Sequence, residues 1–162
     1  MRSVGARAAL RTFGPALRDV VGARFGREPV RIDSVGLPGS TAMMTSPDAY
    51  PGMLRLMHES GVAEDAYPRA VAARIALGIG LYSPQRWVRR IDCPVLVQIV
   101  AQDAITPRAV AERAAARIRR STVRVYDGGH FDPYVAPLFD RVVADQIEFL
   151  TRHVPPLPKE HA

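Results

Sequence analysis

The sequence has one cysteine, almost no lysine and no long apolar run. Its cysteine, Cys93, cannot form an intramolecular disulfide, and because it precedes Pro94 and an apolar strand we expect it to be a small core residue. The cysteine content leaves the redox compartment open, so a reducing cytoplasm is the default expectation. The apolar runs are only a few residues long, whereas a membrane helix needs about 20, so no membrane span is predicted.

Basic residues outnumber acidic ones, 22 against 16, which gives a formal net charge of +6. Clustered Lys and Arg side chains neutralise phosphates in proteins that bind nucleic acids. Here Lys159 is the sole lysine, and the arginines are spread along the chain or paired at predicted helix ends, where the helix dipole favours cations. Because no aromatic residues interleave with a basic stripe, a nucleic-acid partner is not expected.

The amino-terminal segment is rich in arginine and has no acidic residue before Asp19, as in a transit peptide. It lacks the serine richness of such signals, so we expect it to be structural. Gly14-Pro15 predicts a break into two short helices, with Pro15 at a first helical position. Further along, Ser46-Pro47-Asp48 predicts a helix start, with the Ser46 side chain as its cap.

The middle of the chain predicts one short strand followed by helices. Residues 30–33 alternate as a strand does, and residues 68–77 predict a helix that Gly78 and Gly80 end. Ser83-Pro84 then begins a short helix that carries Trp87. Four methionines fall in this region, and they either pack in the core or line an acyl or aromatic pocket. They are Met43, Met44, Met53 and Met57.

The last third of the chain alternates strands and helices. Strands are predicted at 95–100 and 122–126, separated by an Ala-rich helix at about 107–118. A final helix, 137–153, places Leu138, Val142, Ile147 and Leu150 on one side. This order predicts a right-handed βαβ unit with a closing helix, and therefore an α/β fold with parallel strands.

An acid and a histidine follow the two predicted strands. Asp103 comes directly after the first strand, and His130 follows the second through Gly128-Gly129. The carboxyl ends of parallel strands meet at one edge of a sheet, so the two side chains are expected to lie close together there. An imidazole can take a proton from a serine, and a carboxylate can hold its tautomer. The alternative is that Asp103 begins an Asx turn and His130 is a loop histidine; we predict catalytic residues.

These motifs resemble the carboxyl-terminal end of α/β-hydrolase fold enzymes of esterase or peptidase type. "IDCPVLVQIVAQDAITP" is similar to the seventh strand with the triad acid, and "VRVYDGGHFDPY" to the eighth strand with the triad histidine. The resemblance assigns the acid to Asp103 and the base to His130. It implies an α/β, partial α/β-hydrolase fold, in which a helical cap-like and connecting region (1–90) precedes the core segment with the last two parallel strands and closing helices (91–154). The tail, 155–162, is expected to be disordered.

No nucleophile site is visible in the sequence. A G-x-S-x-G elbow is absent, and Ser40, the best-placed serine, is not flanked by small residues on both sides. By the resemblance, the chain starts after the sixth strand, so the serine and the oxyanion amides are expected on another polypeptide or to be lost.

The sequence therefore predicts a hydrolase fragment that is inactive alone, with a small ester or amide as substrate if it is completed. The alternative is a non-catalytic remnant or interaction module that docks on a partner chain. An amino-terminal hydrolase half or a second copy is the expected partner, because an exposed sheet edge favours association. No cofactor and no metal are expected.

Overall fold

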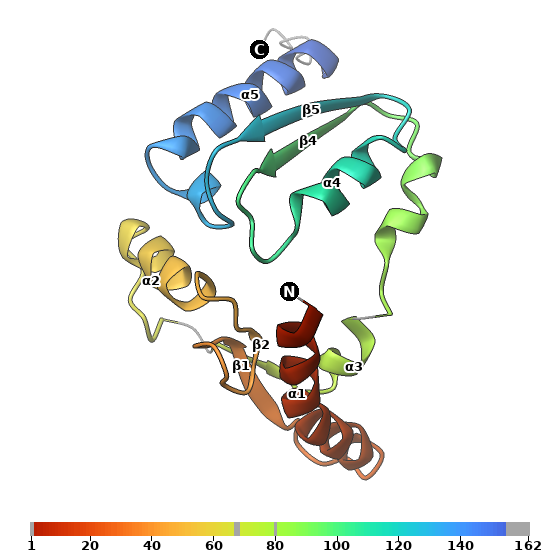
Figure 1. Ribbon diagram of the computed structural model, residues 1–162, viewed down its shortest axis with the longest axis vertical. Helices are drawn as coiled ribbons and strands as arrows, with labels where there is room; N and C mark the ends of the chain where they lie inside the picture. The colour runs from red at the N-terminus through yellow and green to blue at the C-terminus, as the bar shows by residue number, and fades with distance from the viewer. Residues whose placement is uncertain (1, 67–68, 80, 155–162) are drawn as a thin grey trace, which may run out of the picture. The chain divides into compact units, whose positions relative to one another are not determined.

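The computed structural model describes residues 2–66, 69–79 and 81–154 of the chain. It divides the chain into two compact units, Met1–Pro84 (unit 1) and Gln85–Ala162 (unit 2) (Figure 1). The expected disordered tail, 155–162, lies outside the described residues. So do Pro68, where the middle helix was predicted to begin, and Gly80, one of the two glycines predicted to end it. No helix in the described ranges combines the length and the apolar character needed to cross a membrane.

Unit 1 packs helices against a small mixed sheet. In the described residues its helices are α1 (Arg2–Ala23), α2 (Ala49–Glu59) and α3 (Ile75–Ile79), and its strands are β1 (Arg31–Val35), β2 (Ala42–Met44) and β3 (Ala70–Ala72). β1 lies in the middle, parallel to β2 and antiparallel to β3. Ala16, Ile32 and Ala73 form its core, against which Met43 and Leu77 pack.

The amino-terminal helix is continuous, so the predicted break at Gly14-Pro15 is wrong. Proline lacks an N–H, and at Pro15 this removes one bond of the helical ladder. The buried side chains Thr12, Ala16 and Asp19 are spaced at i, i+4 and i+7 across that position. The packing of this face against the rest of unit 1 outweighs the missing bond, because most helix stability in proteins comes from tertiary contacts.

The prediction of a helix at 68–77 is also wrong in part. Residues 70–72 form β3, in which Val71 pairs with Ile32 of β1, and the helix that follows passes through Gly78 to Ile79. Alanine and valine are compatible with both states, so the open edge of β1 decides the conformation. This is a tertiary effect that the local sequence does not carry.

The start of α2 differs from its prediction as well. The helix begins at Ala49 with Asp48 at its N-cap, and no side chain makes a capping hydrogen bond. The Ser46 hydroxyl is enclosed and has no hydrogen-bond partner, while the Ser46 carbonyl accepts from Ala49 N at 3.0 Å. A backbone turn therefore closes the helix start in place of the predicted serine cap. Met57 of α2 is buried, as packing would require.

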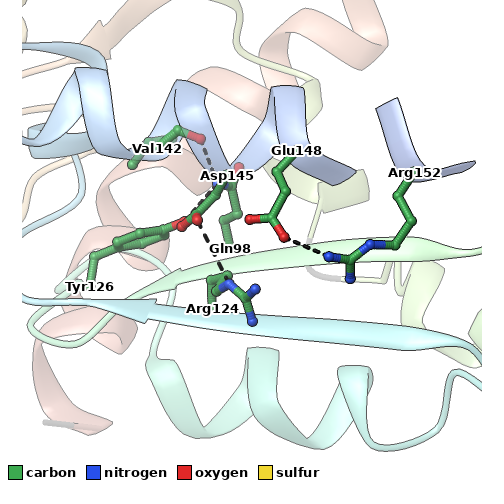
Figure 2. A network of polar contacts seen from close by, with 7 residues as sticks. All are labelled: Gln98, Arg124, Tyr126, Val142, Asp145, Glu148 and Arg152. Atoms are coloured by element: carbon green, nitrogen blue, oxygen red, sulfur yellow. Dashed lines mark hydrogen bonds and ion pairs between the residues drawn. The ribbon is translucent and has the colours of Figure 1, made fainter. Parts of the chain in front are cut away.

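Unit 2 is a two-stranded parallel sheet between two helices. β4 (Val95–Val100) pairs with β5 (Ser121–Tyr126), α4 (Arg108–Ala115) connects them, and α5 (Leu138–His153) follows. Short 3₁₀ helices lie at Pro84–Arg86, Val88–Arg90 and Asp132–Tyr134. α4 and α5 cover opposite faces of the sheet, as Figures 1 and 2 show. The predicted strand, helix, strand, helix order and the parallel pairing are confirmed.

A polar network joins α5 to the sheet (Figure 2). Gln98 Nε2 donates to the Tyr126 hydroxyl at 2.8 Å and to the Val142 carbonyl at 3.0 Å. The Tyr126 hydroxyl donates to Asp145 Oδ2 at 2.5 Å. Tyr126 is buried with Val100 and Val142, and burial, followed by its bond to Asp145, raises the pKa of its hydroxyl. The network fixes the helix to the end of the sheet that leads to His130.

Three local predictions in unit 2 are corrected. Cys93 is exposed and not buried, because it precedes the first residue of the ladder, Val95. α4 ends at Ala115, earlier than predicted. Ile147 and Leu150 are exposed, because α5 contacts the sheet along its Leu138 and Val142 side and the two strands cover only that side.

Candidate active site

The parallel pairing of β4 and β5 places two ionisable side chains at one edge of the sheet. The register runs from Val95 opposite Ser121 to Val100 opposite Tyr126, so both strands end together. Asp103 follows the end of β4, and His130 follows the end of β5. Both predicted site residues therefore leave the sheet at its carboxyl edge, where ligands bind in parallel α/β sheets.

The structure brings Asp103 and His130 into direct contact. His130 Nδ1 lies 2.9 Å from Asp103 Oδ2, so the two side chains lie close together, as the sequence predicts. The Asp103 side chain is 9% exposed and the His130 side chain 28% exposed. An ionised carboxylate only accepts hydrogen bonds, so Nδ1 carries the proton and donates. In the neutral ring this leaves Nε2 with a free lone pair, the form that acts as a base.

Asp103 uses its two oxygens for different purposes. Oδ1 accepts from the backbone N–H of Ile105 at 2.8 Å and of Thr106 at 2.6 Å, while Oδ2 faces His130. The Asx turn that stood as the alternative interpretation is thus present together with the histidine contact. The turn fixes the carboxylate, so its orientation does not depend on the imidazole.

His130 stands in a tight turn that requires glycine. Gly128 has a φ of +141°, and a Cβ placed there would come within 2.8 Å of Asp132 Oδ2. That same oxygen accepts from Gly129 N at 2.6 Å, and Asp132 N donates back to the Gly129 carbonyl at 3.2 Å. The His130 ring also meets the buried Phe131 ring edge-on, with centroids 5.1 Å apart. The turn therefore holds the histidine backbone from both sides.

Sequence reasoning missed two residues around this pair, Gln102 and Asp132. Both bond the backbone of the Gly128-Gly129 turn. Their positions beside Asp103 and His130 were visible, but glutamine and aspartate in loops carry no specific signal. Only the fold shows which amides they reach.

The described residues offer no serine in an elbow. Ser40 lies in the turn between β1 and β2, so a strand follows it where a nucleophile elbow needs a helix. Its hydroxyl is enclosed without a hydrogen-bond partner. Nor do three or more His, Cys, Asp or Glu side chains gather in this part of the chain as a metal ion would require.

Two solved structures match most of this chain. The α/β hydrolase GrgF from Penicillium sp. sh18 matches with a TM-score of 0.66 and 15% identity, over 90% of this chain and 50% of that chain. DcsB, solved in complex with its substrate analogue, matches with a TM-score of 0.62 and 18% identity, over 93% of this chain and 52% of that chain. These likenesses show that the chain has part of the α/β-hydrolase fold, which confirms the predicted fold class.

Curated relatives are also partly covered. The chain is 40% identical over 146 residues to the quorum-quenching protein AidA of Acinetobacter baumannii (strain MDR-ZJ06), covering 90% of this chain and 47% of AidA. An uncharacterized 31.7 kDa protein of the traX-finO intergenic region of Escherichia coli is 29% identical over 76 residues, 45% of this chain and 27% of that protein. The chain thus spans less than half the length of these relatives. No protein-family model matches it.

Proposed function

We propose that the chain contributes the acid, Asp103, and the general base, His130, of a Ser-His-Asp triad that hydrolyses ester, amide or lactone bonds. The observation that carries the proposal is the 2.9 Å contact between His130 Nδ1 and Asp103 Oδ2 at the carboxyl edge of a parallel sheet. A carboxylate that is separately fixed by two backbone amides is suited to hold one imidazole tautomer. The partial α/β-hydrolase fold supports the same assignment.

The chemistry follows from the positions of the protons. His130 Nε2 would take the proton from a serine hydroxyl as the serine oxygen attacks the carbonyl carbon. The imidazolium then returns that proton to the leaving alcohol or amine as its bond to the acyl carbon breaks. Water repeats the sequence on the acyl-enzyme and releases the acid. Asp103 stays ionised and stabilises the imidazolium in both halves.

The serine and the oxyanion donors belong, in this proposal, to the part of the fold that the chain does not contain. The sequence has no G-x-S-x-G elbow, and the two matched structures are about twice as long as the matched region. That part is either another segment of a longer polypeptide or a separate amino-terminal half. AidA is called a quorum-quenching protein, so a quorum-sensing signal is the first natural substrate to test.

A chimera tests the proposal. The 146 aligned residues of AidA are replaced by those of this chain, and turnover of a short-chain aryl ester and loss of quorum signal in a reporter culture are measured. We expect both activities, and we expect His130→Ala and Asp103→Asn to reduce them by at least about 10³-fold. Arg108→Ala, a substitution on the exposed surface of α4, is the control. An active chimera that keeps its activity in His130→Ala would contradict the proposal.

One observation favours a second candidate, a non-catalytic module that docks on a partner chain. α5 carries an apolar stripe along one flank, separate from its sheet-facing side. Its exposed members are Phe139, Ile147 and Leu150, each 45 to 59% exposed, and Val154, which follows the last residue of the helix, is 62% exposed. An apolar stripe of this kind is suited to a partner of matching shape, either a hydrolase half or a second copy. Sedimentation of the isolated chain, compared with an Ile147→Ser/Leu150→Ser variant, tests for self-association.

A further inference from the structure

We propose that Gln102 is a positioning residue, whose main chain and side chain together hold Gly128 so that His130 faces Asp103. This inference rests on the proposed function, because it concerns the same acid and histidine. Gln102 does not touch the imidazole. It acts through the turn that carries it.

The first observation is a change of register where the sheet ends. Ala101 N donates to the Tyr126 carbonyl at 2.8 Å, as the regular parallel ladder requires. The next donor of a regular ladder would be Asp103, two residues on, and it would reach Gly128. Instead Gln102 N donates to the Gly128 carbonyl at 3.0 Å. Between these two hydrogen bonds the β4 side advances by one residue, from Ala101 to Gln102, while the β5 side advances by two. Asp103 therefore no longer stands at the position of the next ladder donor.

The second observation is that the Gln102 side chain returns to the same glycine. The Gly128 N–H donates to Gln102 Oε1, so the donor and the acceptor of Gly128 both bond to one residue. Rotation of either peptide next to Gly128 breaks one of these bonds. Since glycine at a φ of +141° has no side chain to restrict it, this backbone depends on outside constraints. Asp132 holds the neighbouring Gly129, and Gln102 supplies the bonds at Gly128 itself.

The two observations connect the turn to the chemistry. Asp103 directly follows Gln102, and His130 comes two residues after Gly128. Asp103 is already fixed by its own Asx turn, so the 2.9 Å contact depends on where the His130 backbone is held. Without Oε1 the Gly128 N–H would bond to water, because the contact is exposed. The turn would then sample other orientations, and Asp103 would no longer fix the imidazole tautomer.

Nitrogen NMR of the intact chain, labelled with ¹⁵N-histidine, tests this without any need for turnover. The ¹⁵N shifts of a neutral imidazole differ between its two tautomers, and His130→Ala assigns the signal. We expect one tautomer in the wild type, protonated at Nδ1. In Gln102→Ala we expect a mixture, and exchange of the Gly128 amide that is roughly 2- to 10-fold faster, the range set by one neutral hydrogen bond.

Matched variants separate the clamp from general loss of structure. Gln102→Glu keeps an acceptor oxygen at the same reach and is expected to restore the single tautomer. Gln85→Ala removes an exposed glutamine from the short helix Pro84–Arg86 and is expected to change nothing. If Gln102→Ala unfolds, Gln102→Asn replaces it, with the same amide one carbon shorter. An unchanged tautomer in the folded Ala or Asn variant would overturn the proposal.

The proposed function and the clamp can fail separately. A tautomer that responds to Gln102 in a chain whose AidA chimera hydrolyses nothing supports the clamp and refutes the hydrolase function. An active chimera with a tautomer that ignores Gln102 refutes the clamp and leaves the function standing.

Discussion

Arg74 binds both carboxylate oxygens of Asp19 across 55 residues of sequence. Its Nε and its backbone N each lie 2.8 Å from Oδ2, and its Nη2 lies 3.0 Å from Oδ1. Oδ1 also accepts from Val30 N at 2.9 Å. Asp19 is 1% exposed, so this one acid ties α1 to the start of β1 and to the segment before α3. A buried carboxylate therefore connects three segments of unit 1.

Unit 1 is expected to lose stability in acid through this residue. The hydrogen bond from Arg74, together with the backbone bonds from Arg74 and Val30, lowers the pKa of Asp19 from 3.8 to about 2 against the opposing effect of burial. A carboxyl with a lowered folded-state pKa stabilises the fold fully above its unfolded pKa, and the contribution is lost as the pH falls through the folded value. The loss should therefore fall between about pH 4 and pH 2.

The measurement is the urea midpoint of unit 1 at pH 5 and at pH 2, with unfolding monitored by far-UV circular dichroism. Between pH 5 and pH 2 the urea midpoint of the wild type should fall more than that of Asp19→Asn. The variant is less stable at pH 5, but it has no carboxyl at position 19 to protonate as the pH falls. Asp33→Asn, an exposed acid on β1, is the control and should behave as the wild type. Equal acid sensitivity in the wild type and Asp19→Asn would refute the assignment.

Tyr126→Phe is expected to destabilise unit 2 by about 1–3 kcal/mol, because it leaves Gln98 and Asp145 without their shared hydroxyl in a half-buried interface. Urea unfolding followed by the fluorescence of Trp87, the one tryptophan, measures this. Tyr134→Phe, at a residue 58% exposed, should change stability by less than about 0.5 kcal/mol. Equal effects at the two tyrosines would mean that the network contributes nothing.

Gly128→Ala should cost about 1–3 kcal/mol and weaken the contact between Asp103 and His130. The turn would hold alanine at a φ of +141°, which residues with a Cβ rarely adopt, and the added methyl would lie 2.8 Å from the Asp132 carboxylate. Unfolding of unit 2 gives the first effect, and the His130 ¹⁵N signal gives the second. A variant with unchanged stability and an unchanged signal would show that the turn adapts.

Gly14→Ala should have the opposite sign and stabilise unit 1 by about 0.5–1 kcal/mol. Gly14 lies inside α1, and a Cβ there meets nothing within 4 Å. Alanine restricts the unfolded chain more than glycine does and is the better helix former. A lower thermal midpoint in this variant would argue against a continuous helix through Pro15.

The isolated chain should show no measurable turnover of a short-chain aryl ester. An acid and a histidine without a nucleophile and oxyanion donors lack the contributions that supply most of the rate. The assay compares the wild type with His130→Ala, which should be indistinguishable. Turnover that disappears in His130→Ala would show that a local residue acts as the nucleophile.

The βαβ unit was predictable from the sequence because its signals are local and agree with each other. An apolar run ends at Asp103, alternation resumes before Tyr126, and paired glycines precede His130. The strands are parallel and adjacent, so the sequence positions of Asp103 and His130 were enough to predict that their side chains lie close together.

The features that sequence reasoning missed depend on distant partners. β3 is a strand because it pairs with the edge of β1. α1 continues through Pro15 because the buried side chains before and after that residue pack against the rest of unit 1. The Asp19–Arg74 pair and the bonds from Gln102 to Gly128 join residues that no periodicity relates. Such contacts become visible only when the fold has placed both partners.

The exposure of Cys93 has a practical consequence for work with the purified chain. A lone accessible thiol oxidises to an intermolecular disulfide when reductant is absent, and the product is a covalent dimer. On a sizing column that dimer would look like the association proposed for the α5 stripe. A Cys93→Ser variant cannot form the disulfide, so any dimer that it forms is due to noncovalent association. In the wild type, kept reduced, the same thiol offers a single attachment point for a reporter dye just ahead of β4.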